Sequence, residues 1–131
     1  MPTINYLAVA LATLANMMLG AVWYGVFGEA WLKGLHKRKE DFDPKDPTPY
    51  LVALGGSLLN ALALAVLLQY VQVESLTHGI WVGAAAGTLL TAASMAKHYS
   101  FSRWPAQLFG IDAGVDIVGY VVMSAILTLL R

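Results

Sequence analysis

Four long apolar stretches with few charged residues account for most of this chain. They run over residues 3–27, 49–72, 76–99 and 107–130. A helix needs about 20 residues to cross the ~30 Å hydrocarbon core of a bilayer, and each stretch is at least that long. Unpaired backbone groups are not tolerated in lipid, and these stretches lack the alternation typical of barrel strands. The sequence therefore predicts an all-α membrane protein with four transmembrane helices, forming a single integral membrane domain over residues 1–131.

The overall composition agrees with a membrane protein. Hydrophobic residues make up 58% of the 131 residues and charged residues 12%, against about half and about a quarter in soluble domains. Eight Lys and Arg balance eight Asp and Glu, so no net charge favours binding to nucleic acid. The chain has no cysteine, which excludes disulfides, thiolate metal sites and cysteine nucleophiles.

The basic residues are distributed unevenly between the two sides of the predicted bundle. Seven of the eight fall in the connection over residues 28–48 or near the connection between the last two stretches, namely Lys33, Lys37, Arg38, Lys39, Lys45, Lys97 and Arg103. Loops rich in Lys and Arg stay in the cytoplasm. The sequence therefore predicts a multi-pass protein with this side in the cytoplasm and both termini outside.

The connection over residues 28–48 contains a candidate interfacial helix. Trp31, Leu32 and Leu35 share one helical face, whereas the basic residues of the segment 37–39 fall elsewhere. This pattern is typical of a short helix that lies in the membrane interface, with a solvated linker helix as the alternative. Lys37, Arg38 and Lys39 make anionic lipid at the cytoplasmic face an expected partner.

Small residues recur at helical spacing in three of the stretches. The third stretch carries Gly79, Gly83 and Gly87, the fourth carries Gly110 and Gly114, and the second carries Ser57, Ala61 and Ala65. Such residues let helix backbones approach closely in lipid. They pack within the bundle, or the glycine stripe of the third stretch forms an interface between copies. We expect a homo-oligomer, because four helices leave little interior for a pathway.

Polar residues also occur deep inside the apolar stretches. Asn16 and Asn60 lie near the middle of antiparallel neighbours, so we expect a hydrogen bond between them, acting as structural glue or contacting a substrate. Asp112, Asp116 and Tyr120 follow one another at four-residue spacing on one face of the last stretch. At 1.5 Å per residue, the two aspartates lie roughly 7 and 13 Å past its start.

These aspartates are the main candidates for a functional site. An aspartate at the centre of a membrane helix costs about 3 kcal/mol, so this face should contact protein or water. Lys97 or His98, at the inner end of the third stretch, is an expected partner for Asp112, and Tyr24 lies at the same end. The face either forms a polar pathway for protons or solutes, or holds the third and fourth helices together.

Other chemistry has little support in the sequence. There is no nucleophile with an adjacent base, no H-E-x-x-H motif and no phosphate-binding loop. His78 and His98 lie at opposite ends of one stretch, so they cannot share a metal or haem, and we expect no cofactor. Asp116, His98 and Tyr24 are the only plausible acid–base set, so an enzyme is the least favoured class. A transporter or channel and a non-catalytic accessory protein that binds a partner protein or lipid are equally favoured.

Two segments resemble a known family. "LGAVWYGVFGEAW", residues 19–31, and "LFGIDAG", residues 108–114, are similar to small bacterial membrane proteins grouped as domain of unknown function 1761. The resemblance implies four helices with a longer first connection and a location in the bacterial inner membrane, and it implies no activity. Many members have an asparagine where this chain has Asp112, so the resemblance favours Asp116 for any charge-dependent role.

Overall fold

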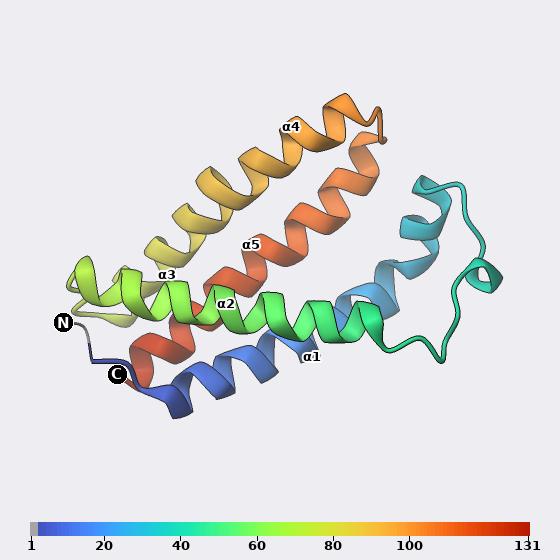
Figure 1. The fold of residues 1–131 in the computed structure, drawn as a ribbon. Helices are drawn as coiled ribbons and strands as arrows, with labels where there is room; N and C mark the ends of the chain where they lie inside the picture. Colours follow the sequence, from blue (N-terminus) through green and yellow to red (C-terminus); the bar gives the residue numbers. More distant parts are fainter. Residues whose placement is uncertain (1–2) are drawn as a thin grey trace.

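The computed structural model describes residues 3–131 and is entirely helical apart from turns and loops (Figure 1). Residues 1 and 2, which belong to the predicted domain, lie outside the described residues. The elements are α1 (Tyr6–Gly34), the 3₁₀ turn η1 (Lys39–Asp41), α2 (Thr48–Tyr70), α3 (Leu76–Ala85), the π-helical segment η2 (Ala86–Ala92), α4 (Ala93–Phe101) and α5 (Ala106–Leu129). α3, η2 and α4 form one continuous rod over Leu76–Phe101, so four helices are long and apolar enough to cross a membrane. The predicted fold class is confirmed.

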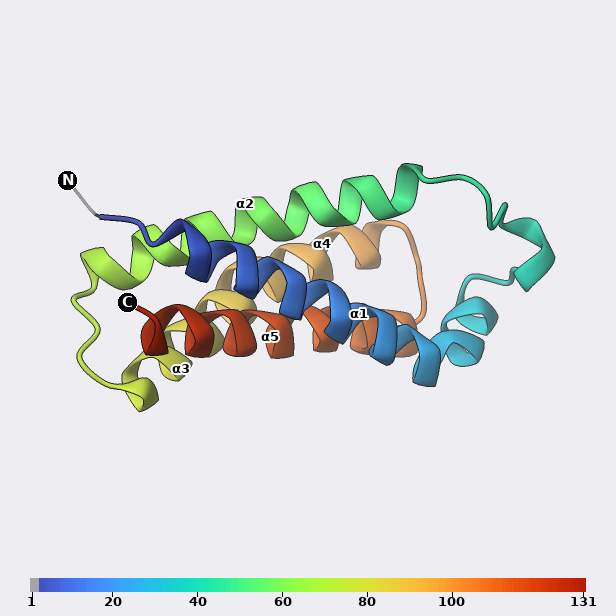
Figure 2. The ribbon, with the colours of Figure 1, turned by 90° about the horizontal axis from the view of Figure 1, so that it is seen from below.

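α5 is the central helix of the bundle. It packs most extensively against α1 and α3, and it also contacts η2, α2 and α4. Both chain ends lie at one end of the bundle (Figures 1 and 2). The α1–α2 and α4–α5 connections lie at the opposite end, which we call the basic end because these connections and the adjoining helix ends carry seven of the eight basic residues.

The core occupies the half of the bundle nearest the chain ends. Ala8, Val9 and Ala12 of α1 face α2, which contributes Ala61, Leu64, Ala65 and Leu68, and α5 contributes Met123 and Leu127. Most of the α1 and α2 side chains in this set are small, so the helix backbones approach closely. Many large apolar side chains point outward instead, including Leu7, Val22, Leu59 and Leu89, each at least 66% exposed. That distribution is expected where lipid covers the outer surface.

The predicted interfacial helix is not a separate element. α1 continues through Trp31 to Gly34, and Leu35 is its C-cap. No proline interrupts the segment from Phe27 to Gly34. Gly34 is buried, and a Cβ atom there would lie 3.4 Å from the Leu108 side chain of α5. The helix stops at His36, whose backbone is left-handed (φ 56°). Lys37, Arg38 and Lys39 therefore lie in the loop and in η1, outside any amphipathic helix.

α2 begins without a close neighbour. Pro47 is its N-cap. The Asp46 carboxylate accepts a hydrogen bond from the Thr48 N–H at 3.0 Å, and this bond lowers the pKa of Asp46 below its ordinary value. Every residue from Thr48 to Gly56 is exposed. This half of α2 points away from α4 (Figure 1), and no extensive contact joins the two helices within residues 3–131.

The π-helical segment keeps one face of the third rod directed at α5. Gly79, Gly83, Gly87, Thr91 and Tyr99 are separated by multiples of four residues, and all of them contact α5. In a straight α-helix, the 20 residues from Gly79 to Tyr99 turn about 200° beyond five full turns. A π-helix closes i→i+5 hydrogen bonds and so takes more residues per turn. η2 therefore absorbs much of this excess rotation, and Tyr99 stays on the side of α5.

Candidate functional site

Asp112 ties three helices together near the basic end. The Tyr24 hydroxyl of α1 donates a hydrogen bond to Asp112 Oδ1 at 2.5 Å. The Tyr99 hydroxyl of α4 donates to Asp112 Oδ2, also at 2.5 Å. Both carboxylate oxygens of Asp112 are therefore held by tyrosines, and we call these three residues the Tyr–Asp–Tyr bridge.

A second contact fixes α1 beside α5 at the same level. The Trp23 indole N–H donates to the Ile111 carbonyl at 2.9 Å. The Trp23 ring lies over Gly114, where a Cβ atom would come within 2.9 Å of Trp23 Cζ2. A side chain at Gly114 would therefore require the indole ring to shift, so the glycine permits this close approach of Trp23 to α5.

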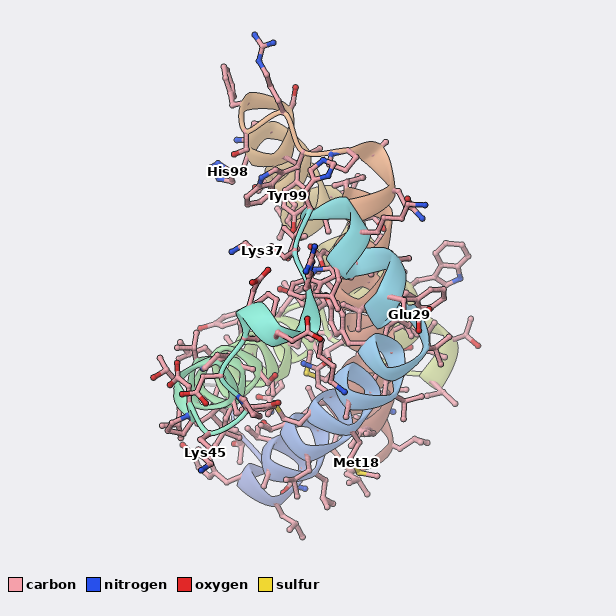
Figure 3. All side chains as sticks on the ribbon, turned by 90° about the vertical axis from the view of Figure 1, so that its right-hand side faces the viewer. Met18, Glu29, Lys37, Lys45, His98 and Tyr99 are labelled. Carbon is pink, nitrogen blue, oxygen red and sulfur yellow. The ribbon has the colours of Figure 1, made fainter. Side chains whose placement is uncertain are left out.

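Lys97 and His98 do not take part in the bridge. Both side chains are exposed, and His98 lies on the surface of α4 (Figure 3). Asp112 is bonded by Tyr24 and Tyr99 instead of by either basic residue. The predicted pairing of Asp112 with Lys97 or His98 is therefore wrong. Tyr99, the residue that follows His98 in α4, faces the Asp112 carboxylate instead.

Asp116 has a different environment from Asp112, although it lies one helical turn further along the same face. Its side chain is half-buried, and no hydrogen-bond partner for its carboxylate occurs within residues 3–131. Tyr120, the next residue of the row, accepts a hydrogen bond from Thr91 Oγ1 of η2 at 2.8 Å. This face of α5 thus carries three different groups. Asp112 has a hydrogen bond to each carboxylate oxygen, Asp116 has none within residues 3–131, and Tyr120 is bonded to Thr91.

The same face of α5 continues into the core. Asp116, Tyr120, Met123 and Leu127 lie at helical spacings of three and four residues on one side of the helix. Met123 and Leu127 pack with Leu64 of α2 in the core cluster. Asp116 therefore lies on the side of α5 that α2 covers nearer the chain ends. At the level of Asp116 itself, α2 has diverged from α4.

Asn16 and Asn60 do not bond to each other. Asn16 Nδ2 donates to Ser57 Oγ of α2 at 2.8 Å. Asn60 is half-buried one turn away, and no hydrogen bond of its side chain occurs in the part of the chain that the structure describes. The expected link between α1 and α2 exists, with a different partner. The Asn16–Ser57 hydrogen bond lies beside Gly119 of α5, where a Cβ atom would overlap the Asn16 amide oxygen.

The predicted glycine stripe packs inside the bundle. A Cβ atom at Gly79 would overlap Thr128, one at Gly83 would lie 2.6 Å from the Tyr120 carbonyl oxygen, and one at Gly87 would lie 3.1 Å from Ile117 Cα. Within a single chain, the stripe is therefore covered by α5. Gly110 was expected to pack as well, but it is exposed and nothing lies within 4 Å of its Cβ position.

Two hollows mark the surface of the bundle, and neither is lined by Asp116 or by a residue of the Tyr–Asp–Tyr bridge. A pocket of about 280 Å³ between α1 and α5 is lined by Trp23, Phe27, Ala30, Gln107, Gly110 and Ile111. A pocket of about 480 Å³ lies near the chain ends and includes Asn5, Gln69 and Arg131 in its lining. Over residues 3–131, no group of three or more His, Cys, Asp or Glu residues is arranged to hold a metal ion.

Three residues of the site are missed by the sequence interpretation. Trp23 and Tyr99 look like members of an aromatic belt at the membrane boundary, and Thr91 looks like any other small residue of a membrane helix. The exact four-residue series that begins at Gly79 is the signal that connects Thr91 and Tyr99 with α5. The four-residue period of this series is longer than the period of an α-helix. The signal is therefore informative only once the π-helical segment has been recognised.

Comparison with known proteins supports the family resemblance. The model of a family described as "Protein of unknown function (DUF1761)" matches residues 7–128. A segment of 63 residues, 47% of the chain, is 40% identical to the undecaprenyl-diphosphatase of Trichlorobacter lovleyi. That match covers 23% of the relative, so the chain spans only a small part of that protein's length. No solved structure matches the chain.

Proposed function

The chain belongs to the DUF1761 family of membrane proteins of unknown function, and we propose that it is a transporter or channel for a cation, with Asp116 as the cation-binding group. The observation that carries this proposal is the unbonded, half-buried carboxylate of Asp116 on a membrane-spanning helix. An aspartate near the centre of a membrane helix costs about 2.5–3.5 kcal/mol on insertion scales. Such residues are retained where they meet a partner, a proton or an ion pathway.

The contrast with Asp112 assigns different roles to the two carboxylates. Asp112 already has a hydrogen-bond donor on each oxygen, so it acts as a structural link between α1, α4 and α5. Asp116 lies one turn deeper along α5 and keeps its acceptor capacity free. A proton or another cation is the partner whose charge complements this group.

The path to Asp116 follows from the arrangement of α2. Its first nine residues, Thr48 to Gly56, are exposed, and this segment points away from α4 (Figure 1). The side of α5 that bears Asp116 is therefore not covered by α2 at this level. The expected homo-oligomer remains a prediction, and the glycine stripe that was its candidate interface is occupied by α5.

Flux measurements in proteoliposomes test this function. We expect the unmodified protein to carry a proton current that Asp116→Asn abolishes, because the amide has nearly the same shape and no negative charge. Glu29→Gln is the matched control, since Glu29 is an exposed acid that projects from α1 (Figure 3). Equal flux in the protein and in Asp116→Asn, at matched incorporation, would remove Asp116 from the pathway.

A second candidate function is the binding of anionic lipid headgroups at the basic end. The observation that favours it is the gathering of seven basic residues at this end of the bundle. The name of the Trichlorobacter lovleyi relative also points to a lipid diphosphate, although the match covers only part of either chain. Replacing Lys37, Arg38 and Lys39 by Gln should weaken association with phosphatidylglycerol or undecaprenyl diphosphate vesicles, and unchanged association would contradict this function.

A further inference from the structure

We infer that the cation bound at Asp116 is a hydrophobic organic cation, such as an aromatic ammonium or phosphonium ion, that enters from the bilayer between α2 and α4. This inference rests on the proposed function and names its substrate class. It depends on three features of the α5 face, namely its free charge, its aromatic rings and its exposure toward the membrane.

The oxygen atoms of this face do not suit a dehydrated metal ion. Hard cations such as calcium take six to eight oxygen ligands, and magnesium takes six. Asp112 already accepts bonds from Tyr24 and Tyr99, and the Tyr120 hydroxyl is bonded to Thr91. Asp116 therefore offers one free carboxylate. An organic cation needs a single counter-charge and no coordination shell.

Aromatic rings flank the free carboxylate on three helices. Tyr24 of α1 and Tyr99 of α4 reach Asp112, which lies one turn before Asp116, and Tyr120 follows one turn after it. Residues four apart on a helix are neighbours, so the Tyr120 ring lies beside Asp116. All three tyrosines are half-buried. Aromatic faces attract ammonium-type cations by about 0.5–2 kcal/mol each, and choline-type ligands are recognised in this way.

The approach to this face is apolar and opens to the membrane. At the level of the site, α2 exposes Tyr50, Leu51, Leu54 and Leu58, with 41–68% of each residue accessible. α2 and α4 share no extensive contact over residues 3–131, and they diverge toward the basic end (Figure 1). A lipid-soluble cation can reach Asp116 from the bilayer between these helices. A strongly hydrated ion would have to shed its water along the same route.

Equilibrium binding of tetraphenylphosphonium to the purified protein in detergent tests the inference. We expect saturable binding by the unmodified protein and by Glu29→Gln, and at least tenfold weaker binding by Asp116→Asn. Asp116→Glu should retain binding, which separates loss of charge from loss of fold. Tetraphenylborate, which has the same shape and the opposite charge, should show no binding that depends on Asp116 when it is measured alone. Tyr120→Leu should weaken binding several-fold, whereas Tyr120→Phe, which keeps the ring, should not.

Each outcome bears on the inference separately from the proposed function. Equal binding of tetraphenylphosphonium by the protein and by Asp116→Asn would overturn the inference, because the cation would then be partitioning without a site. Absence of binding, together with a proton flux that Asp116→Asn abolishes, would overturn the organic substrate and leave the proposed function standing. Binding of tetraphenylborate alone that Asp116→Asn abolishes would also contradict the inference, because it would show that the site does not select positive charge.

Discussion

At the scale of single residues, the Tyr–Asp–Tyr bridge should contribute measurably to stability. Phe at position 24 or 99 removes one donor and leaves one oxygen of the Asp112 carboxylate unpaired. Interhelical hydrogen bonds in membranes average about 0.6 kcal/mol and reach about 2. We expect Tyr24→Phe and Tyr99→Phe each to destabilise the protein by about 1–2 kcal/mol, measured by unfolding in mixed detergent micelles. Tyr6→Phe is the control, because Tyr6 is 70% exposed, and equal stability of all three variants would contradict the bridge.

Two glycines with different surroundings give a second test at this scale. A methyl group at Gly83 would meet the Tyr120 carbonyl oxygen at 2.6 Å, whereas one at Gly110 would meet no atom within 4 Å. Overpacking typically costs 1–3 kcal/mol. We therefore expect Gly83→Ala to lower the free energy of unfolding by about that amount and Gly110→Ala to change it by less than about 0.5 kcal/mol. A tolerated Gly83→Ala would indicate that α3 and α5 are not in close contact.

The same residues show how far sequence reasoning reaches. Spacing alone identified Gly79, Gly83 and Gly87 as a packing stripe and placed Asp112 and Asp116 on one face, because both follow from the geometry of one helix. The partner of each group depends on how two helices are rotated against each other. Asn16 bonds to Ser57 rather than Asn60, and Asp112 bonds to Tyr99 rather than His98. A shift of one to three residues on the neighbouring helix decides such pairs.

At the scale of elements, the π-helical segment η2 determines which face of α4 points toward α5. A π-helical segment usually holds one residue more than the α-helical turn it replaces. We expect deletion of Leu90, which is 66% exposed, to convert η2 to α-helix while α3 and α4 keep their faces toward α5. Insertion of one alanine after Ala93 should instead rotate Tyr99 by about 100°, away from Asp112.

Combining Tyr99→Phe with each of these two variants tests this rotation of α4. In the Leu90 deletion, Tyr99→Phe should cost as much stability as it does in the unmodified protein, because the bond to Asp112 persists. In the alanine insertion, Tyr99→Phe should cost nothing further. An equal cost of Tyr99→Phe in both backgrounds would show that η2 does not control the rotation of α4.

The end of α1 and the direction of α2 depend on contacts between helices, which the sequence pattern does not reveal. The four apolar stretches predicted the spans because hydrophobic length is a local property. The end of α1 is not local, since Gly34 is buried against Leu108 of α5 and Trp31 packs on Phe42 with ring centroids 5.8 Å apart. The divergence of α2 from α4 is likewise a property of the assembled bundle. Both features required the three-dimensional arrangement.

At the scale of the whole molecule, the two ends of the bundle differ in their number of basic residues. The end with the α1–α2 and α4–α5 connections holds seven basic residues, and the end with both chain termini holds Arg131. Loops rich in Lys and Arg are retained in the cytoplasm. We therefore expect alkaline phosphatase fused after Arg131 to be active and green fluorescent protein at the same site to be dark.

A reporter in the α1–α2 connection supplies the complementary measurement. Green fluorescent protein inserted in the segment 43–46 should fluoresce, because this exposed loop is predicted to lie in the cytoplasm. Replacing Lys37, Arg38 and Lys39 by Gln removes three of the seven basic residues from this end and should produce a mixture of orientations. An inactive phosphatase after Arg131 in the unmodified chain would reverse the predicted topology. Asp116 would then open toward the opposite leaflet, and a substrate that enters from the bilayer would come from that side.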